Sequence, residues 1–97
     1  MKTIYISIEQ EQTGKRIREL MHLNDLKVKD IQVACGFEHP QAVYKWMNGE
    51  CLPSIDNLCV LAYIFKTTID GILVKSGDAA FILSQKYITV INLHKQV

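Results

Sequence analysis

The fold is decided by the stretch KDIQVACGFEHPQAVYKWMNG, residues 29–49. Apolar residues recur at helical spacing over 27–35, and Gly36 follows where a residue of positive φ ends a helix. Pro40 suits the first position of a new helix because its missing N–H costs nothing there, and an Asn-Gly pair at 48–49 closes that helix about two turns later. The stretch therefore predicts two short helices, 27–35 and 40–47, joined by a tight turn.

Three further helices are predicted on either side of this pair. An amphipathic pattern begins near Glu9 and ends near residues 22–24, Ser54 caps a fourth helix, and Thr67 or Thr68 caps a fifth. Every connection is short, so the helices are expected to pack as neighbours. The positions expected to face the core are Ile17, Leu20 and Met21 in the first helix, Ile55, Leu58, Cys59, Ala62 and Phe65 in the fourth, and Ile69, Ile72 and Leu73 in the fifth.

Both ends of the sequence have β-prone patterns. Residues 3–8 alternate between isoleucines and other residues with the period of two that is typical of a strand. Residues 86–93 (KYITVINL) are rich in β-branched residues without clean alternation. For the segment after Lys75, a helix followed by a strand and one continuous helix both stay open, while residues 76–78 predict a turn. The expected fold class is all-α with short β-strands at the N- and C-terminal ends.

Length and composition exclude several classes of protein. With 97 residues the chain fits one domain, and 48% apolar residues supply a core without a metal or disulfide. No apolar run approaches the roughly 18 residues of a membrane span, and the first residues do not resemble a signal peptide, so a cytoplasmic protein is expected. Three cysteines without CxxC spacing are interpreted as reduced thiols. A net charge of +1 requires any nucleic acid to be bound by a local patch.

The helix predicted over 40–47 separates its side chains into two faces when they are placed at 100° per residue. One face is polar and the other apolar: Gln41, Tyr44, Lys45 and Asn48 against Ala42, Val43, Trp46 and Met47. An amide that pairs with adenine, a cation that addresses guanine or phosphate, and a phenol are groups that read base edges. Two short helices with such a face describe a helix-turn-helix, whose second helix fits the major groove. An ordinary surface helix of an all-α bundle is the alternative that periodicity leaves open.

Five separated segments also agree, in order and spacing, with a known family. They are GKRIREL (14–20), KDIQVACGF (29–37), PQAVYKWMNG (40–49), LPSIDNLCVLAYIF (52–65) and TTIDGILV (67–74). The chain resembles, over about residues 9–74, the Cro and phage-repressor type of helix-turn-helix domain, the XRE family. Its members are five-helix, sequence-specific DNA binders, usually dimeric, which act as transcriptional regulators or antitoxins. The resemblance implies a lambda-repressor-like domain over 9–74, with 1–8 and 75–97 as terminal extensions.

The resemblance also implies roles for particular residues. The expected readers of base edges are Gln41, Tyr44 and Lys45. The expected phosphate contacts, assisted by the helix dipole at the start of the second helix, are Asn48, Val28 and Lys29. Further candidates for contacts with the DNA backbone are Lys15, Arg16, Lys27 and His39. For each of these four, a solvated surface position is the alternative.

The chain departs from the family pattern around its second helix. Lys27 stands where the family has a capping Ser or Thr, and because Lys cannot accept a hydrogen bond, this helix is expected to fray. The turn over 36–40 is one residue longer than the common form, which affects the register of Gln41 in the groove. Gln32 replaces a small residue between the two motif helices, so their packing angle is expected to differ. The net charge predicts weak non-specific DNA affinity.

Other chemistry has no basis in the sequence. The three histidines lack helical metal-pair spacing, so a metal site is not expected. No nucleophile–base pair, paired carboxylates or Gly-rich phosphate loop is present, so the protein is not expected to be an enzyme or to use a cofactor. Trp46 is interpreted as a core anchor, and Cys59 as packing material.

The expected function is that of a transcriptional regulator, repressor-like, which reads operator DNA with the third helix as a homodimer. The terminal extensions, residues 1–8 and 75–97, contain the β-prone stretches 3–8 and 86–93 and are candidate dimerisation elements. A sixth helix that covers the first and fifth helices is the alternative for the C-terminal segment. Two rival functions stay open. One is an antitoxin that binds a toxin partner through its C-terminal segment, and the other is a protein-interaction module that has lost DNA binding.

Overall fold

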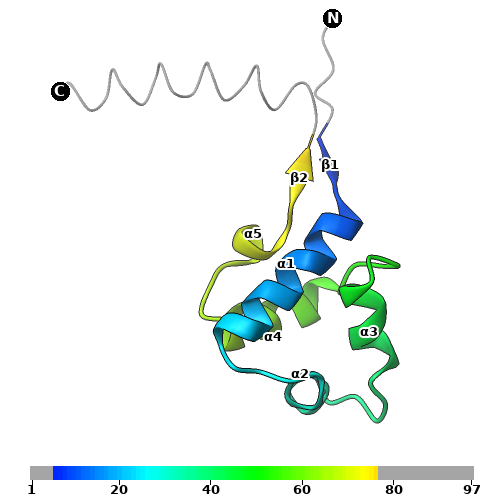
Figure 1. The fold of residues 1–97 in the computed structure, drawn as a ribbon, viewed down its shortest axis with the longest axis vertical. Coiled ribbons are helices and arrows are strands. Elements are labelled where there is room, and N and C mark those ends of the chain that lie inside the picture. Colours follow the sequence, from blue (N-terminus) through cyan, green and yellow to red (C-terminus); the bar gives the residue numbers. More distant parts are fainter. Residues whose placement is uncertain (1–5, 77–97) are drawn as a thin grey trace, which may run out of the picture. The chain divides into compact units, whose positions relative to one another are not determined.

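The structure is a computed structural model that describes residues 6–76. The chain falls into two compact units, Ile8–Val74 and a unit made of Met1–Ser7 with Lys75–Val97. The Ile8–Val74 unit holds five helices around one core (Figure 1), which confirms the all-α prediction. They are α1 (Gln10–Leu23), α2 (Val28–Cys35), α3 (Gln41–Met47), α4 (Ile55–Ile64) and α5 (Ile69–Ile72).

Several helix ends follow directly from residues that the sequence makes visible. Gly36 closes α2 in the left-handed conformation, with φ of 72°. The hydroxyls of Ser54 and Thr68 each accept a hydrogen bond from the N–H three residues further on, at 3.2 Å and 3.0 Å, and so cap α4 and α5. Pro40 precedes α3 as its N-cap residue, not as its first helical residue, so α3 is one residue shorter than predicted.

The start of α2 corrects the interpretation of Lys27. Its side chain accepts no hydrogen bond, as expected, but the Asp30 carboxylate accepts one from the Lys27 backbone N–H at 2.8 Å. This is the reciprocal half of a capping box, and it places a negative charge in the first turn, where the helix dipole favours it. The expectation that α2 frays considered residue 27 alone and overlooked Asp30.

The core is built from all five helices. Its members are buried side chains, and they are Ile17, Leu20, Met21, Ile31, Val43, Trp46, Leu58, Leu61, Phe65 and Ile72. The predicted inward stripe of α4 is wrong in two places, because Ile55 is 69% exposed and Cys59 is exposed, whereas Leu61 is fully buried. Only two of the ten residues of α4 are polar, so its hydrophobic pattern does not specify which side faces inward.

A short two-stranded sheet is formed by β1 (Ser7–Ile8) and β2 (Lys75–Ser76). The hydroxyl oxygens of Ser7 and Ser76 lie 3.4 Å apart. The end of the predicted N-terminal strand is thus a strand, but its partner is a segment whose last residue, Ser76, was expected to start a turn. The predicted strand at 86–93, the turn residues 77–78 and residues 3–5 lie outside the described residues.

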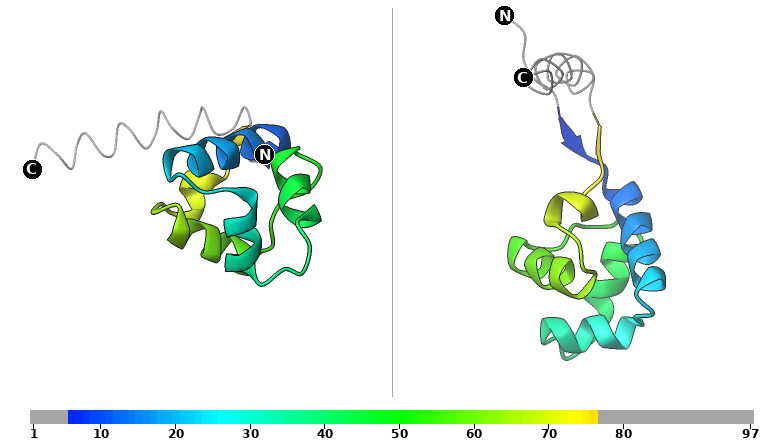
Figure 2. Two further views of the ribbon diagram at one scale, coloured as in Figure 1. Left: turned by 60° about the horizontal axis from the view of Figure 1, so that its bottom comes forward. Right: turned by 90° about the vertical axis from the view of Figure 1, so that its left-hand side faces the viewer.

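The backbones of α1 and α3 approach each other closely at Gly14, which is buried in α1. A Cβ atom at this position would lie 2.6 Å from the carbonyl oxygens of both Trp46 and Met47 at the end of α3. Gly49, just beyond the end of α3, makes a second close approach to α1. A Cβ atom at Gly49 would lie 2.7 Å from the Cα of Glu11. Both views in Figure 2 show α1 running beside α3. Glycine at these two positions therefore sets how closely α3 docks on α1.

We expect Gly14→Ala to destabilise the domain by about 1–3 kcal/mol, as overpacking does when its neighbours cannot move away. The sign is informative, because alanine in an ordinary helix interior would stabilise it by about 1 kcal/mol over glycine. Urea unfolding followed by circular dichroism measures the change, with Gln12→Ala at an exposed position of the same helix as the control. A more stable Gly14→Ala protein would show that the two helices are not in close contact.

Candidate nucleic-acid interface

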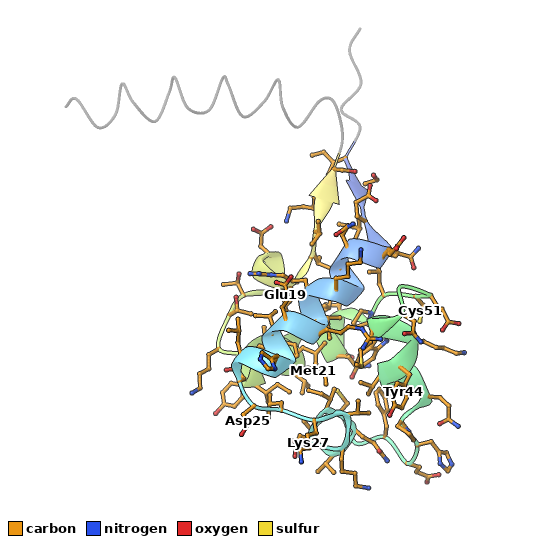
Figure 3. All side chains as sticks on the ribbon, viewed as in Figure 1. Glu19, Met21, Asp25, Lys27, Tyr44 and Cys51 are labelled. Carbon is orange, nitrogen blue, oxygen red and sulfur yellow. The ribbon has the colours of Figure 1, made fainter. Side chains whose placement is uncertain are left out.

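The two faces of α3 are separated as the sequence predicts. Gln41, Tyr44, Lys45 and Asn48 are all exposed at this helix or its end, whereas Val43 is fully buried and Trp46 is 4% exposed. Trp46 is therefore a core anchor. The exposed phenol of Tyr44 lies between the Gln41 amide and the Asn48 amide along the helix, and Figure 3 labels it on α3. The face offers donors and acceptors together with one cation.

The turn before α3 is braced from inside by Gln32. This side chain is 8% exposed, and its Nε2 donates hydrogen bonds to the carbonyl oxygens of Phe37 at 3.3 Å and Glu38 at 3.0 Å. The Phe37 ring in turn packs edge-on against Trp46, with ring centroids 5.6 Å apart. Gln32, expected only to change the helix packing angle, thus satisfies the backbone of the lengthened turn. The turn fixes where Gln41 begins α3.

The start of α2 presents two of the expected phosphate contacts. Lys29 is exposed and Val28 is half-buried, and the first N–H groups of a helix have no intrahelical acceptor. Lys27, labelled in Figure 3, and His39 are also exposed. Asp30 adds a carboxylate at the same helix start.

Arg18 is a residue of this surface that the sequence interpretation missed. From α1, its Nη2 donates to Oδ1 of Asn48 at 2.8 Å and its Nε donates to the carbonyl oxygen of Met47 at 3.3 Å. A cation thus lies on the C-terminal end of α3, where the helix dipole favours positive charge. Arg18 follows Gly14 by four residues and therefore lies on the same side of α1, but only the structure shows that this side faces the end of α3.

Arg16 does not belong to this surface, although it was a candidate. Its Nε donates to the carbonyl oxygen of Gly71 at 2.9 Å, and its Nη1 lies 3.5 Å from the Glu19 carboxylate. Arg16 therefore attaches α1 to α5. Lys15 is exposed on α1.

The charges around the helix-turn-helix cancel. Residues 27–50 contain three lysines and three acidic residues, namely Lys27, Lys29, Lys45, Asp30, Glu38 and Glu50. Arg18 is the additional cation that α1 contributes at the end of α3. Attraction of a phosphate backbone would thus depend on where individual cations are placed, and not on a strong positive field.

Other chemistry in the described residues is limited. Among residues 6–76 no group of three or more His, Cys, Asp or Glu side chains is placed to hold a metal ion. No helix in this part of the chain is long and apolar enough to cross a membrane. Partial burial raises the pKa of the Cys35 thiol above its usual value, because desolvation disfavours the thiolate.

We expect Gln32→Met, which keeps the length of the side chain but removes its donor, to destabilise the domain by about 1–2 kcal/mol. The emission of Trp46 should also shift to longer wavelength, because Phe37 loses the support that holds it on the indole. Urea unfolding and tryptophan fluorescence measure both effects. The control is Val33→Ala, because Val33 is 66% exposed on the same helix and should change stability by less than about 0.5 kcal/mol. Equal stability of the two variants would contradict the bracing role.

Comparisons with known proteins agree with this fold. No protein-family model and no curated protein matches the chain. Among solved structures, the restriction-modification controller protein C.AhdI from Aeromonas hydrophila matches with a TM-score of 0.58 and 21% identity, over 65% of this chain and 94% of that chain. The DNA-binding domain of BldD matches with a TM-score of 0.56 and 15% identity, over 68% of this chain and 94% of that chain. The Ile8–Val74 unit therefore has a helix-turn-helix fold that it shares with these two structures.

Proposed function

We propose that this protein is a DNA-binding transcriptional regulator, repressor-like and of the XRE type, that reads operator DNA with α3. One observation carries the proposal. The polar residues of α3 are exposed together, while Val43 and Trp46 anchor the opposite side of the same short helix. The two structures of similar fold are named as a controller protein and as a DNA-binding domain, which supports the same function.

In this proposal α3 lies in the major groove, and its side chains contact different parts of the DNA. Gln41, at the first turn of α3, pairs with adenine through its amide, and Lys45, one turn later, reaches guanine or a phosphate. Tyr44 lies between them and contacts an adjacent base edge. Asn48 keeps its amide hydrogens for a phosphate while its oxygen accepts the bond from Arg18.

The phosphate backbone is held from α2 and α1. Lys29 and the first N–H groups of α2 approach one phosphate, and Lys27 and His39 border the same edge of the motif. Because the surrounding charges cancel and few phosphates are neutralised, this non-specific part of the binding is weak. A homodimer that places two α3 helices in half-sites one DNA turn apart, about 34 Å, would compensate for it.

We expect Gln41→Ala and Lys29→Ala to weaken DNA binding in different ways. Gln41→Ala should cost about 1–3 kcal/mol on the preferred site and relax the choice of base at one position, because it removes a base contact. Lys29→Ala should weaken all sequences alike and reduce the slope of log affinity against log salt by about 1, because it removes a phosphate contact. Selection of bound duplexes from a randomised pool defines the site, and fluorescence anisotropy at several salt concentrations measures both effects.

The control is Gln12→Ala, an exposed position on α1 that has no role in the proposed contacts. Equal losses on all sequences for Gln41→Ala and Lys29→Ala would contradict the assigned division between base and phosphate. If the unmodified chain selects no duplex at about 50 mM salt, where phosphate contacts contribute most, the function itself is wrong.

A further inference from the structure

The C-terminal end of α3 is completed by a side chain of α1. The last four carbonyl groups of a helix have no partner within it. Those of residues 44–46 accept hydrogen bonds from the backbone N–H groups of residues 48–50, over 2.9 to 3.1 Å. The fourth, of Met47, accepts one from Nε of Arg18 at 3.3 Å. Arg18 therefore supplies the donor that the backbone does not provide at this end of α3.

The same guanidinium fixes the side chain of Asn48. Its Nη2 donates to Oδ1 of Asn48 at 2.8 Å, while Nε is held by the Met47 carbonyl. Because the guanidinium is planar and rigid, each bond restricts the geometry of the other. Arg has hydrogen-bond donors only, so the amide atom that faces it must be the oxygen. The NH2 group of Asn48, an exposed residue, is then left without an acceptor among the described residues.

The positive charge of Arg18 strengthens this arrangement. Arg18 is exposed, and no carboxylate among residues 6–76 forms an ion pair with it. A hydrogen bond from a charged donor is about twice as strong as one between neutral groups, so the amide is held firmly in one orientation. The bond also draws electron density toward Oδ1, and this polarisation makes the NH2 group of Asn48 a stronger donor.

We propose that Arg18 is a positioning residue for DNA recognition, which turns the Asn48 oxygen toward α1 and commits this side chain to donating hydrogen bonds. The inference rests on the proposed function. Pairing with adenine needs both amide atoms, because the oxygen accepts from N6 and the NH2 group donates to N7. Asn48 therefore cannot read adenine and donates to a phosphate oxygen. Gln41, whose amide has no partner among the described residues, keeps both atoms for a base.

The first test needs no DNA. In NMR spectra of the full chain labelled with nitrogen-15, the Asn48 side-chain NH2 signals, assigned by their loss in Asn48→Ala, should shift in Arg18→Met, because the amide loses its charged partner. The control Lys66→Met removes the same charge from an exposed residue beyond α4 and should leave these signals in place. Circular dichroism confirms that the helices are retained. Asn48 signals that stay in place in Arg18→Met overturn the positioning and leave the proposed function standing.

A double-mutant cycle tests whether Arg18 acts through Asn48. Fluorescence anisotropy is measured on the duplex that the unmodified chain selects from a randomised pool. Arg18→Met and Asn48→Ala should each weaken binding about tenfold, and the double variant should also be about tenfold weaker, because both changes remove the same contact. The control Lys66→Met should change the affinity less than about twofold, because distant exposed charges are screened. Additive losses, about a hundredfold in the double variant, would mean that Arg18 contacts DNA by itself and overturn the proposal.

Base preference tests the consequence for specificity. Asn48→Ala should select the same bases from the randomised pool as the unmodified chain, with uniformly lower affinity, because a donor to phosphate carries no sequence information. A preference for adenine that is lost only in Asn48→Ala would show that this amide reads a base, and it overturns the proposal while DNA binding stands. If the unmodified chain selects no duplex, the proposed function and this inference are both wrong, even where the NMR signals of Asn48 respond to Arg18→Met.

Discussion

The contact on which the rest of the structure depends is the backbone approach of α1 to the C-terminal end of α3 at Gly14. A helix of only seven residues has little stability of its own, so its position has to be imposed by its neighbours. At Gly14 the position of α3 is fixed sterically, because there is no space for even one methyl group beside the Trp46 and Met47 carbonyls. Arg18 then adds hydrogen bonds to the same end from one turn further along α1. The exposed face of α3 is therefore oriented by α1 as much as by its partner in the motif.

The other end of α3 is fixed by a buried polar group. Gln32 lies almost out of contact with water, where an unpaired amide would cost free energy, and its two bonds to the turn remove that cost. Among the described residues no buried side-chain nitrogen or oxygen lacks a hydrogen-bond partner. The lengthened turn is thus compatible with a defined start of α3. The hydrogen bonds from Gln32 and the contact of Phe37 with Trp46 both restrict the conformation of the turn.

A feature of the structure could be predicted from the sequence where residues close to it in the chain determine it. The five helices and most of their ends could be predicted, because Gly36, Ser54 and Thr68 act on the backbone within three residues of themselves. The inward face of α4 could not, because a helix that is apolar on nearly every side has no pattern to orient it. Arg18 and Gln32 were missed or misinterpreted because their partners lie in other elements or in a turn, and only the fold brings them together.

The charge balance around α3 has a consequence for how the proposed regulator would act. The α3 face is polar and its surroundings carry balanced charge, so a single copy has little electrostatic attraction to DNA. In the proposed homodimer the binding of one α3 helix makes the binding of the second intramolecular, and effective concentration can raise the combined affinity by orders of magnitude without any new interaction. Occupancy of the DNA would then depend steeply on protein concentration, because dimerisation and DNA binding have to occur together. A domain with a strongly basic surface would lose this sensitivity, since it would bind DNA one copy at a time.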